Sequence, residues 1–325
     1  MEDELFEQRT DLGKLNEAVE KIKAAVANII VGQHESVELL IAGILADGHI
    51  LIEGVPGVAK TLTAKLIARS INADYSRIQF TPDLMPSDIL GTPVFNPKTT
   101  DFEFRQGPIF GNIILIDEIN RAPAKTQSAL FEVMEERQVT IDGKTYKMQE
   151  PFTVIATQNP VEHEGTYRLP EAQLDRFIFK IEIKYPSLDE EIAIIMQQHQ
   201  QKTADQLQNI SPVLSGQEVI ALREQVLGLH VEEKLLIYVA KIIHESRNNK
   251  SLFLGGSPRA SLAIVNAAKA LAAIRGRDFV TPDDIVYVTP AVLRHRIMLT
   301  PDREMEGSTP DDVIAQIIQK IEIPR

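Results

Sequence analysis

Short apolar runs alternate with longer helix-like segments in the first half of the chain. The runs with strand character are His49–Glu53, Tyr75–Phe80, Asn112–Asp117, Phe152–Thr157 and Phe177–Ile183. Segments 12–30 and 34–47, which precede them, carry apolar residues at helical spacing. Strand-sized runs separated by helices are typical of a parallel sheet covered by helices. The first half therefore predicts an α/β fold, in which these runs form one parallel five-stranded sheet.

Two further stretches in this half have the pattern of inserted hairpins. In residues 138–148, Asp142 and Gly143 separate two short β-prone runs, and Asp-Gly is a typical type I′ turn pair. Residues 91–106 show weaker strand character around positions 96–101. We expect both stretches to form hairpins in the α/β domain, and plain surface hairpins without a role are the alternative.

The pattern changes after Tyr185 and Pro186, because no strand-like run follows and helix-start signals dominate. Capping boxes and N-cap–proline pairs mark these starts. The signals are Ser187 with Glu190, Ser215 with Glu218, Ser257–Pro258, Thr281–Pro282 and Thr309–Pro310. We therefore expect a smaller all-α domain over residues 187–325, after an α/β domain over 1–186. The exact boundary, between about 186 and 215, stays open at this point.

Composition narrows the function classes. The 325 residues carry a formal net charge of -12, which argues against nucleic acid and anionic membrane as partners. The chain has no Cys, and its seven His lack metal-ligand spacing, so we expect no zinc site. The absence of Cys favours a cytoplasmic protein, and an acidic start without an apolar stretch argues against a signal peptide. No apolar run is long enough for membrane insertion.

A glycine-rich segment follows the first predicted strand directly. It ends in Lys60 and Thr61 and opens a helix, which is the context that a phosphate-binding loop requires. The backbone N–H groups of such a loop and the helix N-terminus bind phosphate. Lys60 would then reach the β- and γ-phosphates, and Thr61 would bind Mg²⁺. The alternative is a glycine-rich turn beside an ordinary helix.

Ala59 departs from the usual loop pattern, in which a glycine precedes the lysine. We expect that this position cannot use the positive φ angles that glycine adopts freely, and that its methyl group fits close to the phosphates. The expected nucleotide-binding residues in and beside the loop are Gly54, Val55, Pro56, Gly57, Val58, Ala59, Lys60, Thr61 and Leu62.

Polar residues end two other predicted strands. Asp117 and Glu118 follow the apolar run 113–116, and Asn159 follows the run 154–157 after one further polar residue. The carboxyl edge of a parallel sheet is where such folds bind ligands. We expect Asp117 to hold Mg²⁺, Glu118 to orient and deprotonate the attacking water, and Asn159 to bind that water or the γ-phosphate. Solvated acids and a turn Asn before Pro160 are the alternatives.

Taken in order along the chain, these motifs resemble the MoxR family of AAA+ ATPases. The segments that carry the resemblance are Val31-Gly32-Gln33, GVPGVAKT at 54–61, LIDEINRAP at 115–123, ATQNP at 156–160, LPEAQLDRF at 169–177 and GGSPRA at 255–260. They span most of the chain, and their combination is specific although each segment alone is not. The resemblance implies an AAA+ P-loop domain followed by a helical lid.

The resemblance also implies roles for residues outside the loop and the strand ends. Arg176 matches the arginine finger, which acts on ATP held by a neighbouring subunit, and Arg259 matches sensor 2. Arg259 stands in the first turn of a predicted helix, where a cation opposes the helix dipole, so an anionic partner is expected. ATP is one candidate partner, and ion pairs within the subunit are the alternative for both arginines. Gln33 matches the segment that packs near adenine.

The function implied is a ring-forming ATPase, by analogy hexameric, that uses ATP and Mg²⁺ to remodel or assemble partner protein complexes. A partner with a von Willebrand A domain is common beside MoxR relatives. Three alternatives remain: an ATP-dependent binding scaffold with negligible turnover, the ATPase subunit of a metal chelatase, and a nucleic-acid motor. The negative charge speaks against the last of these.

Overall fold

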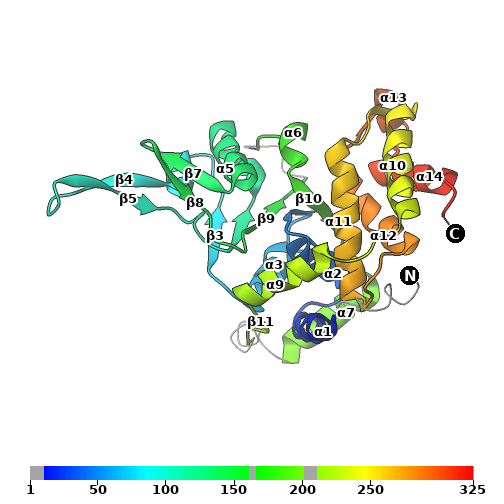
Figure 1. Ribbon diagram of the computed structural model, residues 1–325, viewed down its shortest axis with the longest axis horizontal. Coiled ribbons are helices and arrows are strands. Elements are labelled where there is room, and N and C mark those ends of the chain that lie inside the picture. The colour runs from blue at the N-terminus through cyan, green and yellow to red at the C-terminus, as the bar shows by residue number, and fades with distance from the viewer. Residues whose placement is uncertain (1–10, 161–165, 201–210, 325) are drawn as a thin grey trace, which may run out of the picture.

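The computed structural model describes residues 11–160, 166–200 and 211–324. Its centre is a five-stranded sheet in the order β10-β1-β9-β6-β3, in which every neighbouring pair is parallel (Figure 1). The strands are β1 (His49–Gly54), β3 (Tyr75–Gln79), β6 (Ile113–Asp117), β9 (Thr153–Gln158) and β10 (Phe177–Ile183). The predicted α/β fold and each predicted strand are therefore confirmed.

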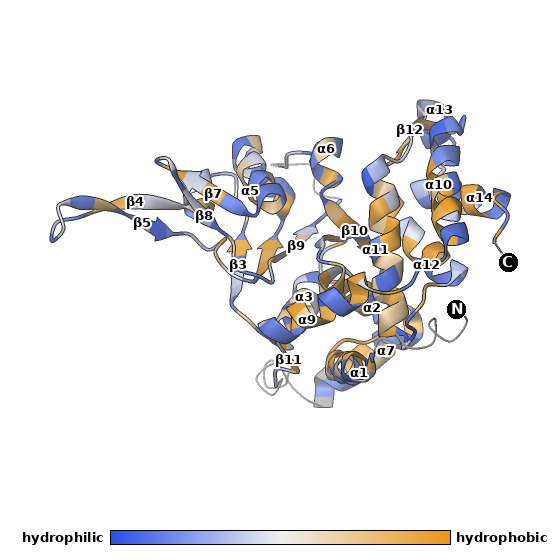
Figure 2. Ribbon diagram, in the orientation of Figure 1, coloured by the Kyte–Doolittle hydropathy of each residue, from blue (hydrophilic) through white to orange (hydrophobic). Residues whose placement is uncertain are grey.

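Alternate residues of the central strands pack against different layers. In β1, Ile50 and Ile52 join the core shared with α1 (Gly13–Ala27), α2 (His34–Leu45) and α3 (Lys60–Arg69). Leu51 faces the opposite way, into a second core with the helices α4 (Pro86–Leu90) and α5 (Ala124–Glu136). This period of two follows from the pleat of the strand. Figure 2 shows the resulting apolar centre between polar outer helix faces.

Both predicted hairpins are present. The strands β7 (Gln138–Ile141) and β8 (Lys144–Lys147) meet at Asp142 and Gly143, whose φ angles of 50° and 74° fit a type I′ turn. The longer hairpin of β4 (Gly91–Asn96) and β5 (Asp101–Gln106) projects far from the body of the molecule (Figure 1).

Helices dominate the second half, as predicted. They are α7 (Leu188–Gln200), α9 (Gly216–Leu227), α10 (Glu233–Asn248), α11 (Pro258–Ile274), α12 (Pro282–Leu293), α13 (Pro301–Met305) and α14 (Pro310–Lys320). The expectation that no strand follows residue 186 was wrong. In the described part of that half, three short strands occur, namely β11 (Leu214–Ser215), β12 (Leu252–Leu254) and β13 (Met298–Leu299). They are too short to show a period-two pattern in the sequence.

One of these strands ties the second half to the first. β11 pairs in parallel with β2 (Ile71–Asn72), which follows α3. The helix α9 that follows begins with the predicted capping box, because the backbone N–H of Glu218 donates to Ser215 Oγ at 3.2 Å. Among the described residues, no helix is long and apolar enough to cross a membrane.

The lid also attaches to the edge strand β10 through side-chain donors. Just after α12, Arg294 donates to the carbonyl of Lys180 at 3.2 Å and His295 to that of Phe177 at 2.9 Å. Arg296 follows and donates to the carbonyl of Ile178 at 3.1 Å. The lid is therefore hydrogen-bonded to the strand that begins directly after Arg176.

Candidate nucleotide-binding site

The glycine-rich loop connects β1 to α3 at the carboxyl edge of the sheet. A Cβ atom on Gly54 would lie 2.6 Å from the carbonyl oxygen of Ile183, so only glycine fits there. Gly57 has a φ of 85°, which glycine adopts without steric cost. Lys60 folds back over the loop, because its Nζ donates to the carbonyls of Gly54 and Val55. This is the shape of a phosphate cradle at a helix N-terminus.

Ala59 corrects one expectation. It has a φ of 58° and a ψ of 21°, so it does adopt the left-handed conformation that its side chain disfavours. For a residue with a Cβ this conformation costs about 1 kcal/mol. The loop geometry is therefore the one that a glycine would give, held here by an alanine.

Asp117 lies buried at the end of β6, beside the start of α3. Its Oδ1 accepts hydrogen bonds from Thr61 Oγ1 at 2.7 Å and Thr157 Oγ1 at 3.3 Å. Its Oδ2 accepts from Arg77 Nε at 2.7 Å. Adjacent hydroxyl and carboxylate oxygens are the hard ligands that Mg²⁺ takes from a protein, so Thr61 and Asp117 fit the expected metal site.

Glu118 is held in position by its neighbours. Its backbone is left-handed, with φ 56° and ψ 51°. Its Oε2 accepts from Gln79 Nε2 at 2.8 Å and from Arg121 Nη1 at 3.0 Å, and its N–H donates to Thr157 Oγ1 at 3.1 Å. The carboxylate therefore lies close to the expected metal site, fixed by donors from β3 and the short helix η2 (Ile119–Arg121).

A cavity of about 390 Å³ joins these parts. Asn159, which is buried and follows β9, completes it opposite the loop. The residues that line it are Pro56, Gly57, Val58, Ala59, Lys60, Thr61, Leu62, Arg77, Gln79, Asp117, Glu118, Thr157, Gln158 and Asn159. The structure thus brings the predicted loop, both carboxylates and Asn159 to one pocket.

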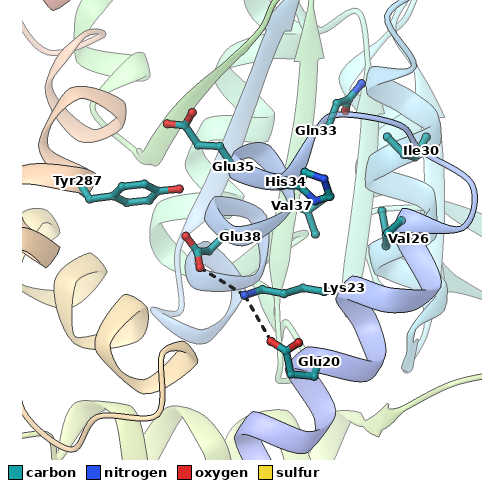
Figure 3. Close-up of a pocket in the computed structure, with 11 residues that line it drawn as sticks. Glu20, Lys23, Val26, Ile30, Gln33, His34, Glu35, Val37, Glu38 and Tyr287 are labelled. Carbon is teal, nitrogen blue, oxygen red and sulfur yellow. Dashed lines mark hydrogen bonds and ion pairs between the residues drawn. The ribbon is translucent and has the colours of Figure 1, made fainter. Parts of the chain in front are cut away.

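Gln33 lies beside the loop and supports it. Its Nε2 donates to the carbonyl of Val58 at 2.9 Å, and its Oε1 accepts from Thr63 Oγ1 at 2.9 Å. Both polar ends of the side chain are therefore used to hold the loop against α3. Gln33 also lines a second cavity of about 430 Å³ between α1, α2 and α12, where Lys23 bridges Glu20 and Glu38 (Figure 3).

Arg176 and Arg259 lie elsewhere, at the amino edge of the sheet. Arg176 Nη1 donates to the carbonyl of Phe131 and lies 4.0 Å from Glu135, and Arg259 pairs with the same Glu135. Neither arginine lines the cavity around Lys60. The ion-pair alternative for Arg259 is thus realised within the subunit, yet 54% of its side chain is exposed.

The amino edge also contains a buried imidazole. His49 begins β1, and its Nε2 lies 3.1 Å from the carbonyl of Met134, while its Nδ1 accepts from the N–H of Val154 at 3.0 Å. Burial lowers the pKa of His49 to about 4. The ring is therefore neutral and joins β1, β9 and α5 at the edge where Arg176 lies.

Comparisons with known proteins show the family to which this chain belongs. The family model described as "ATPase family associated with various cellular activities (AAA)" matches residues 49–179, and an AAA lid domain matches residues 244–317. Chaperone MoxR1 of Mycobacterium tuberculosis is 47% identical over 92% of this chain and 81% of its own length. The chain belongs to the MoxR family of AAA+ ATPases. Another MoxR-like relative, the uncharacterized protein YeaC of Bacillus subtilis, is 46% identical over 95% of each chain.

A solved structure supports the same assignment. The crystal structure of a candidate ATPase from Cytophaga hutchinsonii superposes with a TM-score of 0.86 and is 39% identical, covering 97% of this chain and 96% of that one. The MoxR-type arrangement of a P-loop domain and a helical lid therefore extends over nearly the whole chain.

Sequence reasoning missed two residues of this MoxR-family pocket. Arg77 and Gln79 lie on β3, and the register pairs Gln79 with Asp117. The Arg77 side chain contacts the carboxylate of Asp117, and the Gln79 side chain contacts that of Glu118. The signal was available in the sequence, since two polar residues two positions apart near the end of a strand share one face.

Proposed function

We propose that this chain hydrolyses ATP at the junctions between subunits of a ring. The loop around Lys60 holds the phosphates, and Thr61 and Asp117 hold Mg²⁺, which neutralises charge on the phosphates when bound. Glu118 orients and deprotonates the attacking water, and Asn159 fixes that water or the γ-phosphate. The cavity lined by all of these residues supports the proposal.

One observation carries the subunit-junction part of the proposal. Phe177, directly after Arg176, pairs with His49 at the first residue of β1, whereas the phosphate loop begins at the last residue, Gly54. Five residue steps of strand separate these two ends, about 17 Å at roughly 3.3 Å per residue. Arg176 therefore lies at the opposite edge of the sheet from its own ATP pocket, and a neighbouring subunit's pocket is the one it can complete.

Arg259 shares this location, because it pairs with Glu135 beside Arg176. We therefore assign both cations to the neighbour's ATP, where they stabilise charge in the transition state. An interface that joins the amino edge of one subunit to the carboxyl edge of the next is heterologous, and it gives a ring when the rotation between neighbours closes. A hexamer is the proposed ring, with residues 187–325 as the lid on the domain of residues 1–186.

The work done by hydrolysis is proposed to be chaperone-like remodelling of partner protein complexes, with a von Willebrand A domain protein as one class of partner. A relative that is named a chaperone supports this. The projecting hairpin offers a contact for such a client, because Phe95 and Phe102 pair across its strands at 5.5 Å, and Phe102 is 64% exposed.

Glu118→Gln tests the proposal. The variant keeps the side-chain shape, so it should bind ATP with a dissociation constant within about twofold of the wild type, while turnover falls by about 100-fold or more because the base is lost. Arg303→Ala, at an exposed ion pair on α13, is the control and should leave both quantities unchanged. Undiminished turnover in Glu118→Gln would contradict the assigned chemistry. A wild type that binds ATP without turnover would support the scaffold alternative.

A further inference from the structure

A single buried guanidinium from the lid contacts the residues on both sides of Arg176. Arg296 Nε donates to Asp175 Oδ1 at 2.6 Å, and its Nη2 donates to the carbonyls of Asp175 at 3.0 Å and Phe177 at 2.6 Å. Its Nη1 donates to the carbonyls of Ile178 at 3.1 Å and Val292 at 2.5 Å. An arginine has five N–H donors, so the side chain is fully engaged.

Because the Arg296 side chain is buried, the loss of any of these hydrogen bonds would be energetically costly. Only 3% of the Arg296 side chain is exposed, and burial lowers its pKa while the carboxylate of Asp175 opposes that effect. A buried charge that loses its partners is costly, so the position of Arg296 and the position of Asp175 are strongly coupled. The backbone of Arg176 lies between two carbonyls that Arg296 fixes.

A second lid residue reaches the same carboxylate. Ser257 precedes α11 and was expected to cap it, but the side chain makes no cap hydrogen bond and instead lies 3.4 Å from Asp175 Oδ2. Arg259 follows in the first turn of that helix. The lid therefore contacts the segment of Arg176 through Arg296 and Ser257 and carries Arg259 alongside it.

We propose that Arg296 is the positioning residue that fixes Arg176 to the lid. The lid, Arg176 and Arg259 then move as one rigid unit relative to the neighbour's ATP. Any change in lid orientation then changes how Arg176 meets that ATP. This inference rests on the proposed action of Arg176 in the neighbouring subunit's site. It adds a residue that touches neither nucleotide nor water and acts only through Asp175 and Phe177.

Arg296→Lys tests the inference in the full-length assembled protein. Lysine keeps the charge near Asp175 but cannot bind both flanking carbonyls in the fixed fork geometry of a guanidinium. The dissociation constant for ATP should stay within about twofold, while kcat falls by about 100-fold, as expected when a catalytic group is misplaced by about 1 Å. Thermal unfolding and sedimentation confirm that the variant is folded and assembled.

Arg294→Lys is the matched control. Arg294 lies directly after α12, two positions before Arg296. It pairs with Asp311 and donates to the carbonyl of Lys180 on β10. Arg294 contacts neither Asp175 nor Phe177, so the kcat of the Arg294→Lys variant should stay within about threefold of the wild type. An equal loss of kcat in both variants would show that general lid docking matters and would overturn a specific role for Arg296.

An experiment with mixed subunits distinguishes a misplaced Arg176 from damage to the ATP pocket of the Arg296→Lys subunit itself. Arg296→Lys subunits keep an intact ATP pocket, and Lys60→Ala subunits keep an intact Arg176. In a heterologous ring mixed at equal ratio, about a quarter of the junctions combine the two intact halves, so turnover should return to about that fraction of the wild type. Arg176→Ala mixed with Lys60→Ala is the reference and should recover equally.

The outcomes are distinct. Recovery with Arg176→Ala but not with Arg296→Lys would overturn the inference and leave the proposed function intact. Recovery in neither mixture would overturn the proposed action in the neighbouring subunit itself. If Arg296→Lys fails to fold, Asp175→Asn takes its place, with kcat expected to fall about tenfold and to recover in the same mixture. Wild-type kcat in a folded Arg296→Lys or Asp175→Asn would also overturn the inference.

Discussion

The two edges of the central sheet are built in opposite ways. At the carboxyl edge, a glycine-rich loop and the carboxylates Asp117 and Glu118 surround an open cavity of about 390 Å³. At the amino edge, two arginines share the acid Glu135, and neutral and charged lid donors bind the strand β10. In the proposed function, the carboxyl edge receives phosphate and metal, and the amino edge presents cations. Each edge holds what the other lacks for phosphoryl transfer.

The difference has a consequence for the rigidity of each edge. The carboxylates at the carboxyl edge are held by solvent-exposed side chains such as Arg77, Gln79 and Arg121. The amino edge is fixed by buried groups, including His49 and Arg296, whose hydrogen bonds have no solvent substitute. The exposed donors of the carboxyl edge and the buried donors of the amino edge suit the proposed function, in which a preorganised cation acts on a neighbour's substrate.

The largest expected effect comes from the amino edge. Arg176→Ala should lower kcat by about 1,000-fold, the scale of an arginine finger, because transition-state charge on the neighbour's ATP loses its cation. The affinity for ATP should change by less than about threefold, since the residue lies outside its own subunit's pocket. Steady-state turnover and equilibrium binding on the same sample measure the two effects. A parallel loss of both would show that Arg176 also binds ATP in the ground state and would contradict a role confined to the transition state.

A substitution at the carboxyl edge should lower the affinity for ATP, which Arg176→Ala leaves nearly unchanged. Lys60→Ala removes the cation that would meet the β- and γ-phosphates, so we expect ATP affinity to fall by at least about 100-fold, and turnover with it. Calorimetric titration with a non-hydrolysable nucleotide measures the change. Lys65→Ala, on the same helix but outside the residues that line the cavity, is the matched control. Unchanged affinity in Lys60→Ala would refute the loop assignment.

The sequence predicted the fold and most of the carboxyl edge, apart from Arg77, Gln79 and the left-handed conformation of Ala59. Strand runs that end in polar residues and a glycine-rich loop are local patterns, so the positions of Lys60, Asp117 and Asn159 could be predicted. The contacts at the amino edge could not be predicted from local sequence patterns. Its pairs join residues far apart in the chain, such as Arg296 with Asp175 and Arg259 with Glu135, and no local spacing indicates them. Ser257 shows the limit, because a correct helix start did not reveal its contact with Asp175.

A smaller effect concerns the pH dependence of stability at the amino edge. The pKa of His49 is lowered by burial from 6.5 to about 4, so the unfolded chain binds a proton there that the folded chain refuses. The contribution of the neutral His49 ring to the free energy of unfolding is therefore fully present above about pH 6.5, and it is lost as the pH falls toward 4. The loss attributable to His49 is about 3 kcal/mol. Protonation would place an N–H on Nδ1, which already accepts from Val154.

Urea unfolding of the wild type and His49→Gln at pH 8 and pH 4.5 measures this loss. The variant lacks the titrating ring, so the free energy of unfolding should fall less between the two pH values than it does in the wild type. At pH 8 the variant should be the less stable protein, because glutamine cannot reproduce both ring hydrogen bonds. Equal pH dependence of the two proteins would show that the ring does not stay neutral in the folded state.

The smallest effect tests the carboxyl edge at Ala59. Glycine removes the strain of the left-handed conformation, about 1 kcal/mol, but it also makes the unfolded chain more flexible, which costs 0.4 to about 1 kcal/mol. Ala59→Gly should therefore change the free energy of unfolding by less than about 1 kcal/mol and ATP affinity by less than about twofold. Asp142→Gly is the matched control, because Asp142 is also left-handed, with a φ of 50°, but lies on the hairpin. If Ala59→Gly alone shifted ATP affinity by tenfold or more, the methyl group itself would contact the phosphates, and the cradle would be shaped by that side chain as well as by its backbone.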